Sequence, residues 1–145
     1  MGTGSRDKGQ GKAMNVFTVK LRNEPGAFAK VAEAVANSGV DILAVGGGGI
    51  GDAGVGALIT DNDVATRQAL QETNCEFNEA EAIVADLEDQ PGTLARAARA
   101  LADAGVNVTG LLIVQSLGDR ARLAFAVDDP AKALEALASV GATGM

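Results

Sequence analysis

The sequence predicts an α+β fold made of two ferredoxin-like βαββαβ modules, each with an antiparallel sheet and helices on one face. The first observation is a repeat: Asn23–Phe28 (NEPGAF) recurs 66 residues later as Asp89–Leu94 (DQPGTL). The second is that Gly39–Ile42 (GVDI) recurs at the same spacing as Gly105–Val108 (GVNV). Because both matches keep one register over a long stretch, they indicate a duplicated module.

Each copy begins with a half-buried strand. In the first copy Phe17, Val19 and Leu21 alternate with polar residues along 16–22, and a period of two is typical of a strand with one buried face. The matching residues of the second copy are Ile83, Ala85 and Leu87.

A helix follows the Pro-Gly pair in each copy. Pro is favoured in the first turn of a helix because its missing N–H costs nothing there. Gly39 and Gly105 stand where a residue in left-handed geometry would end each helix. The apolar residues at helical spacing are Phe28, Val31, Ala32 and Val35 in the first copy, and Leu94, Ala97, Ala98 and Leu101 in the second.

The rest of each copy predicts two strands, a second helix and a short last strand. The two strands are expected at 40–45 and 55–60 in the first copy, and at 106–114 and 122–127 in the second. Candidate caps of the second helix are Asp61 or Asn62, and Asp128 or Asp129. The residues expected to face inward from that helix are Val64, Leu70, Leu134 and Leu137. The last strands are expected at 75–77 and 142–145.

These elements predict one domain at residues 14–78 and a second at 79–145. Residues 1–13, in which glycines alternate with polar residues, predict a flexible tail because they offer nothing to bury. The continuous apolar run Leu111–Val114 indicates a strand buried on both faces. We therefore expect the first copy or a second chain to cover the second copy; a fully internal contact without oligomerisation is the alternative.

Composition excludes several classes of function. The net charge of −7 disfavours nucleic-acid and membrane-surface partners, and no apolar run reaches the roughly 18 residues of a membrane span. Without any His, Ser-His and Cys-His nucleophile pairs are impossible, so we expect no catalytic machinery, no metal site and no cofactor. A single Cys, Cys75, and the absence of a signal peptide predict a cytoplasmic protein.

The repeated Pro-Gly corner is the candidate ligand site. Backbone N–H groups at a helix start lack partners within the helix, and the helix dipole adds positive charge there, so a small carboxylate is the natural ligand. Gly26 and Gly92 lack a Cβ and let a ligand approach the backbone closely. The alternative is that Pro-Gly only starts a helix.

The series of strand, Asx-x-Pro-Gly, helix and Gly-Val-Asx resembles the ACT domain, a regulatory amino-acid-binding module, in tandem from residue 14 onward. The resemblance implies an amino acid or similar carboxylate bound near domain interfaces, a homodimer, and a metabolic enzyme as partner. The site residues that it implies are Asn23, Glu24, Gly26, Ala27, Phe28 and Asp41 in the first copy, and Asp89, Gln90, Gly92, Thr93, Leu94 and Asn107 in the second.

In serine-binding members of that family, the Asx before the Pro and the Asx opening the next strand contact the amino acid. A His of those members is replaced here by Leu21 and Leu87, so serine specificity is not carried over. Asp89 brings negative charge to the second corner, which implies a different ligand pose there or a site occupied only in the first copy. For each Asx the alternative role is helix capping or turn stabilisation.

Gly46, Gly48 and Gly51 match a dinucleotide-binding pattern, but a strand follows instead of a helix. We interpret this glycine run as a flexible hairpin that forms a mobile flap over a ligand. The leading functional hypothesis is a sensor or regulatory subunit. The alternatives are a structural or assembly subunit with vestigial ligand sites, and an enzyme using Asp or Glu chemistry.

Overall fold

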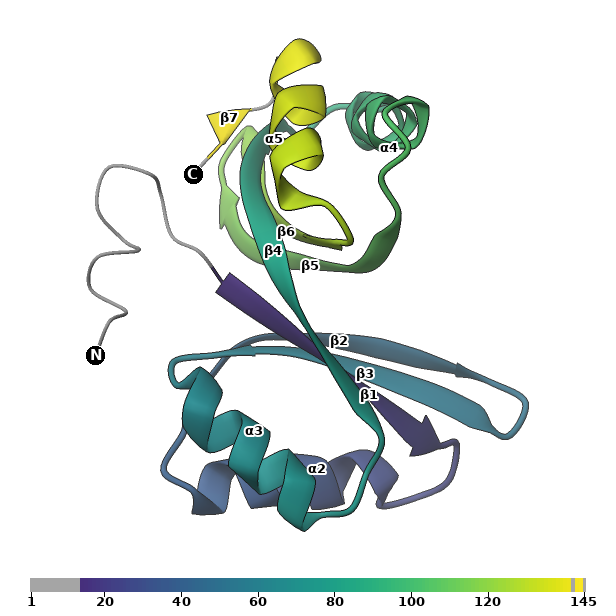
Figure 1. Cartoon of the computed structure of the whole chain (residues 1–145), viewed down its shortest axis with the longest axis vertical. Coiled ribbons are helices and arrows are strands. Elements are labelled where there is room, and N and C mark those ends of the chain that lie inside the picture. Colours follow the sequence, from purple (N-terminus) through teal and green to yellow (C-terminus); the bar gives the residue numbers. More distant parts are fainter. Residues whose placement is uncertain (1–13, 142, 145) are drawn as a thin grey trace. The chain divides into compact units, whose positions relative to one another are not determined.

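The computed structural model describes residues 14–141 and 143–144 (Figure 1). It contains two compact units, Val16–Glu79 and one that continues from Ala80, called the first and second module below. The elements of the first module are β1 (Met14–Arg22), α2 (Ala27–Asn37), β2 (Ile42–Ile50), β3 (Ala53–Thr60), α3 (Asp63–Glu72) and the start of β4 (Phe77–Glu88). Those of the second are the rest of β4, α4 (Thr93–Asp103), β5 (Val108–Leu117), β6 (Arg120–Val127), α5 (Pro130–Ser139) and β7 (Thr143–Gly144).

The order confirms the predicted α+β class with two βαββαβ modules. The tail predicted at 1–13 lies outside the described residues, as do Ala142 and Met145 of the predicted last strand.

The first module has an antiparallel sheet in the order β2-β3-β1-β4, with α2 and α3 on one face (Figure 1). The register sets Phe17 opposite Leu58, and both lie in the core. From the helices, Val31 and Val35 of α2 and Ala69 and Leu70 of α3 complete this core.

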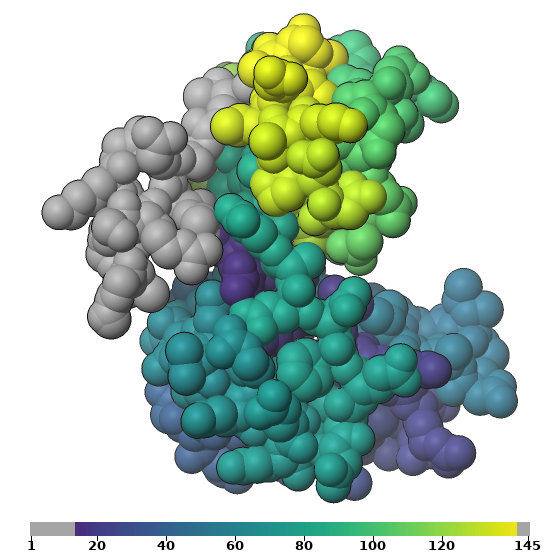
Figure 2. Space-filling model, in the orientation of Figure 1, coloured from purple at the N-terminus to yellow at the C-terminus, as the bar shows by residue number. Residues whose placement is uncertain are grey.

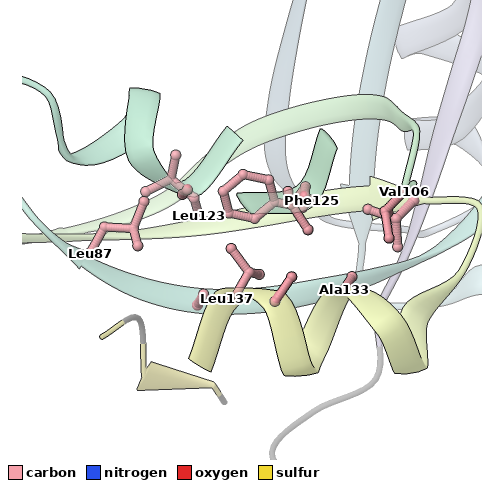
Figure 3. Packing of buried hydrophobic residues seen from close by; sticks show 11 residues of the cluster. Leu87, Val106, Leu123, Phe125, Ala133 and Leu137 are labelled. Atoms are coloured by element: carbon pink, nitrogen blue, oxygen red, sulfur yellow. The ribbon is translucent and has the colours of Figure 1, made fainter. Parts of the chain in front are cut away.

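The second module repeats this packing. Its strands run in the order β5-β6-β4, and β7 pairs with β4 at Ala85 and Asp86. Figure 3 shows the core, in which Leu123 and Phe125 of β6 lie with Leu87 of β4 and Leu137 of α5. Aliphatic and Ala side chains build both cores, as expected of a chain with four Phe and no Trp or Tyr.

Several strand predictions were too short. The strand expected at 75–77 begins only at Phe77, and from there it is continuous with the strand expected around Ile83 as β4, because no Gly or Pro interrupts residues 78–82. The glycine run is not a loop: Gly46–Gly49 lie inside β2 and pair with β3, and the turn contains only Gly51 and Asp52.

Some predicted faces were wrong. Val64 and Leu134 are exposed, because the buried stripes of α3 and α5 are formed by Thr66, Ala69 and Leu70, and by Ala133, Ala136 and Leu137. In the run Leu111–Val114 only Leu112 is buried, while Ile113 is 66% exposed, so the second module by itself does not bury both faces of this strand; cover by a second chain stays a prediction.

The helix ends follow the predicted local chemistry. The Asn62 and Asp129 side chains accept hydrogen bonds from the N–H groups of Ala65 (3.0 Å) and Lys132 (3.2 Å). Gly39 and Gly105 have φ of 75° and 78°, the left-handed geometry expected after a helix.

Candidate ligand-binding site

The Pro-Gly corner is a type II turn that leads into a helix. The Ala27 N–H donates to the Glu24 carbonyl oxygen (3.3 Å), and Gly26 has φ 87° and ψ −11°, which requires glycine. The second module repeats the turn, with Thr93 bonded to Gln90 (3.2 Å) and Gly92 at φ 89°. Pro25 and Pro91 therefore occupy the second position of a turn, and their predicted place in the first turn of the helix was wrong.

The two helices that follow these corners have no side-chain cap. By contrast, α3 and α5 are capped by Asn62 and Asp129. Helix-start N–H groups without a side-chain partner bind water or an anion, and the helix dipole favours the anion. The repeated motif thus marks the two helix starts that are available to a ligand.

Asn23 connects the corner to the β2–β3 hairpin. Its Nδ2 donates to the Gly51 carbonyl oxygen (2.8 Å), and its backbone N–H donates to the Asp52 carbonyl oxygen (3.0 Å). In the second module, the Asp89 N–H donates to the Asp119 carbonyl oxygen (2.8 Å). Each Asx before the Pro therefore holds a hairpin tip beside its corner.

The second Asx of each copy lies at the other end of the sheet. Asp61 accepts a hydrogen bond from the Asp41 N–H (3.0 Å), and Asp128 accepts one from the Asn107 N–H (2.9 Å). The eight residues of β3 separate this end from the hairpin tip, which amounts to roughly 25 Å at strand spacing. Within one module, then, Asn23 does not meet Asp41, and Asp89 does not meet Asn107.

A groove of about 430 Å³ opens beside the first corner, entirely within the first module. Of the predicted residues, Asn23, Glu24, Ala27 and Phe28 line it. Sequence reasoning missed the rest of its lining: Leu21, Arg22, Val45, Gly46–Gly49 and Gly54–Gly56. The signal was the glycine run, but its place depends on the pairing of β2 with β3. Figure 2 shows this hairpin on the surface at the lower right.

Three basic side chains lie at the first corner. Lys20, Arg22 and Lys30 line a second hollow of about 370 Å³ that includes Pro25 and Gly26. Glu24 also lines this hollow, and Lys20 lies 3.6 Å from Glu76. Arg22 lies 3.8 Å from Glu24 in a pair whose side chains are 83% and 55% exposed. An exposed pair of this kind contributes little to stability, so both charges are free to reorganise around a ligand.

The second corner differs in charge. Its residues matching Lys20, Arg22 and Asn23 are Asp86, Glu88 and Asp89. The Arg122 guanidinium donates to both Asp86 carboxylate oxygens (2.8 and 3.1 Å), and this hydrogen bonding lowers the pKa of Asp86. Asp86 is thus engaged within the module; Glu88 and Asp89 add negative charge, and Arg96, which matches Lys30, keeps a positive charge beside Gly92.

The fold defines a duplicated βαββαβ protein, and comparison with known proteins gives a family match for its second module. Residues 82–142 match the family model described as ACT domain. This match confirms, for the second module, the resemblance seen in the sequence. The first module shares the element order of the second and is related to it by the internal repeat.

Solved structures share the fold. A protein from Bacteroides thetaiotaomicron, BT0572, is 18% identical, with 92% of both chains covered and a TM-score of 0.72. The ligand-free regulatory subunit of aspartate kinase from Thermus thermophilus is 17% identical, with 88% of this chain and 91% of that chain covered and a TM-score of 0.60. Its counterpart from Thermus flavus is 16% identical, with 89% and 92% covered and a TM-score of 0.62. No curated protein matches the chain.

Two further features are absent from the described residues. Within them, no group of three or more metal-ligating side chains could hold an ion. None of the helices in this part of the chain is long and apolar enough to cross a membrane.

Proposed function

We propose that this chain is a non-catalytic regulatory module that binds an amino acid at the first corner. The observation that carries the proposal is the start of α2, which lacks a side-chain cap and opens beside a groove with a polar rim. The ACT domain of the second module and the fold shared with regulatory subunits of aspartate kinase support the regulatory role.

The charges of the first corner suit an α-amino acid. Its carboxylate would lie at the first-turn N–H groups of α2, assisted by Arg22 and Lys30. Its ammonium would lie near the Glu24 carboxylate, and the Asn23 side chain would complete the rim. The site residues that the family resemblance implies for the first copy thus fall into two groups. Those of the first corner bind the ligand headgroup, and Asp41 does not contact the ligand bound in its own module.

Regulation requires that the ligand favour one state of the protein over another. In this proposal, occupancy of the corner also holds the hairpin that Asn23 contacts, and a partner enzyme of metabolism senses the change. The predicted cytoplasmic location belongs to the same proposal.

The proposal includes a homodimer formed through an edge strand. Within the described residues β5 pairs only with β6, and its sequence contains no charged residue or Pro to discourage pairing with another strand. On this strand Leu111 is 41% exposed and Ile113 is 66% exposed. We expect light scattering to show a dimer that dissociates in Ile113→Lys, because a charge at an edge strand opposes association. A monomeric wild-type protein would contradict this part of the proposal.

The ligand proposal is tested by thermal unfolding with each of the standard amino acids in turn. A ligand at a hundred times its Kd stabilises the folded state by about 2.7 kcal/mol, which raises Tm by several degrees. The control is Gly26→Val, which puts a branched side chain at φ 87° and should remove the shift by distorting the corner. If no amino acid shifts Tm in the correctly assembled protein, the sensor proposal is wrong.

The alternative, a structural or assembly subunit with vestigial sites, is favoured by the second corner alone. There the acidic residues and the Asp86–Arg122 pair leave little reason for a carboxylate to bind. The amino-acid series decides between the two functions, because an assembly subunit responds to none of the amino acids.

A further inference from the structure

We propose that the amino acid bound at the first corner has an apolar side chain, which lies on a patch of bare backbone formed by four glycines. This inference rests on the proposed function and adds the class of ligand. The patch consists of Gly47, Gly49, Gly54 and Gly56, named the glycine patch below.

Strand register places the four glycines on one face of the sheet. Gly47 pairs with Gly56 and Gly49 pairs with Gly54, so the four form two neighbouring cross-strand pairs. Gly54 and Gly56 alternate in step with Leu58, which lies in the core beneath the helices. The glycine patch is therefore on the helix-covered face, where other strand positions carry core side chains.

The groove over the glycine patch has apolar walls and a polar rim. Leu21 of β1, Phe28 of α2 and Val45 of β2 line it, and Phe28 and Val45 remain 39% and 54% exposed. Arg22, Asn23 and Glu24 line its rim. A ligand with a charged headgroup and an apolar chain matches both parts, because covering the exposed apolar walls contributes about 25 cal/mol per Å² buried.

The second module shows that this fold does not require the patch. With Pro25 aligned to Pro91, Gly47 corresponds to Ile113, and the residue opposite Ile113 is Leu123, where the first module has Gly56. Ile113 and Leu123 thus bring side chains to the place where the first module has glycine. Part of that place is taken by Phe28, whose ring would lie 3.3 Å from a Cβ at Gly56, and the rest lines the groove.

The individual glycines are not equivalent. A Cβ at Gly49 would lie 2.8 Å from Asn23 Cγ, and one at Gly47 would collide with the Val55 carbonyl oxygen. A Cβ at Gly54 would instead meet its nearest atom, the Leu21 carbonyl oxygen, at 3.5 Å, an ordinary contact, and Gly54 does not have positive φ. Gly54 is therefore the position where a side chain can enter the groove without disturbing the backbone.

The test is isothermal titration calorimetry on the full chain and its Gly54→Val variant. The probes are valine, leucine, isoleucine, methionine and phenylalanine, compared with serine, aspartate and lysine. We expect one or more apolar amino acids to bind the wild type, with Kd raised at least tenfold in Gly54→Val. The control is Val64→Ala, because Val64 is 59% exposed and lines neither hollow of the first corner; it should leave Kd within about twofold, well below a 1.4 kcal/mol change.

The outcomes separate this inference from the proposed function. Binding of serine, aspartate or lysine in preference to the apolar probes overturns the apolar class and leaves the amino-acid site standing. Apolar binding with equal Kd in Gly54→Val overturns the glycine patch as the site. Binding of no amino acid overturns the proposed function itself. Should Gly54→Val fail to fold, Gly54→Ala replaces it. A second measurement uses the wild type, in which we expect leucine to shift the NMR signals of the Gly46–Gly49 amides. Unchanged signals would contradict the proposal.

Discussion

Phe125→Ala is expected to destabilise the protein by about 3–5 kcal/mol, the usual cost of removing a buried aromatic ring and leaving a cavity. Phe125 is 1% exposed and lies in the core of the second module with Leu123 and Leu137 (Figure 3). Phe125 is the one aromatic residue among the buried residues of that core, and Ala97, Ala133 and Ala136 form much of its helix side. Small rigid neighbours cannot collapse into the space of a lost ring.

Urea unfolding followed by circular dichroism measures this loss. The matched control is Phe28→Ala, because Phe28 is 39% exposed and its truncation leaves no closed cavity. We expect the control to cost well below half as much. Equal losses in the two variants would show that the cores are not packed as described.

Gly47→Ala is expected to cost about 2–3 kcal/mol, as a forced contact in a packed region does. Its Cβ would collide with the Val55 carbonyl oxygen, which belongs to the neighbouring strand and cannot move without disturbing the β2–β3 pairing. Gly48→Ala, one residue along the same strand, should be neutral or stabilising by about 0.5–1 kcal/mol, because a Cβ there meets nothing and Ala restricts the unfolded chain.

Urea midpoints of the two variants give this comparison directly. A similar midpoint for both would mean that the hairpin is loose in solution, and the glycine run would then be the flexible flap first inferred from the sequence. Clearly different midpoints would show that β2 is paired with β3 in solution, with no room for a side chain at Gly47 and open space at Gly48.

Much of the fold was predictable because local chemistry carries it. The alternation along β1, the glycines at the ends of α2 and α4, and the caps Asn62 and Asp129 all depend on residues close in the chain. The wrong predictions concern short helices, in which a few apolar residues are compatible with either helix face. Val64 and Leu134 were predicted to face inward because they are apolar, but Ala69 and Ala136 lie in the core instead. Small residues carry a weak periodic signal.

The candidate site was predictable only in part. The repeated Pro-Gly motif marked both corners and four of the residues that line the groove. The supposed pairing of Asn23 with Asp41 did not hold within a module, because strand β3 keeps them at opposite ends of the sheet. Spacing along the chain contains no information about which end of a sheet a residue reaches.

By itself, the sequence determined the duplication, the α+β class and the two helix starts that follow a Pro-Gly turn. These depend on period, turn chemistry and self-similarity, which are read along one segment. Only the tertiary structure decided that Gly47 faces Gly56 and Gly49 faces Gly54, and that the second module pairs Ile113 with Leu123 where the first pairs two glycines. Cross-strand register joins residues distant in the chain, and the free energy that selects it comes from packing the whole module.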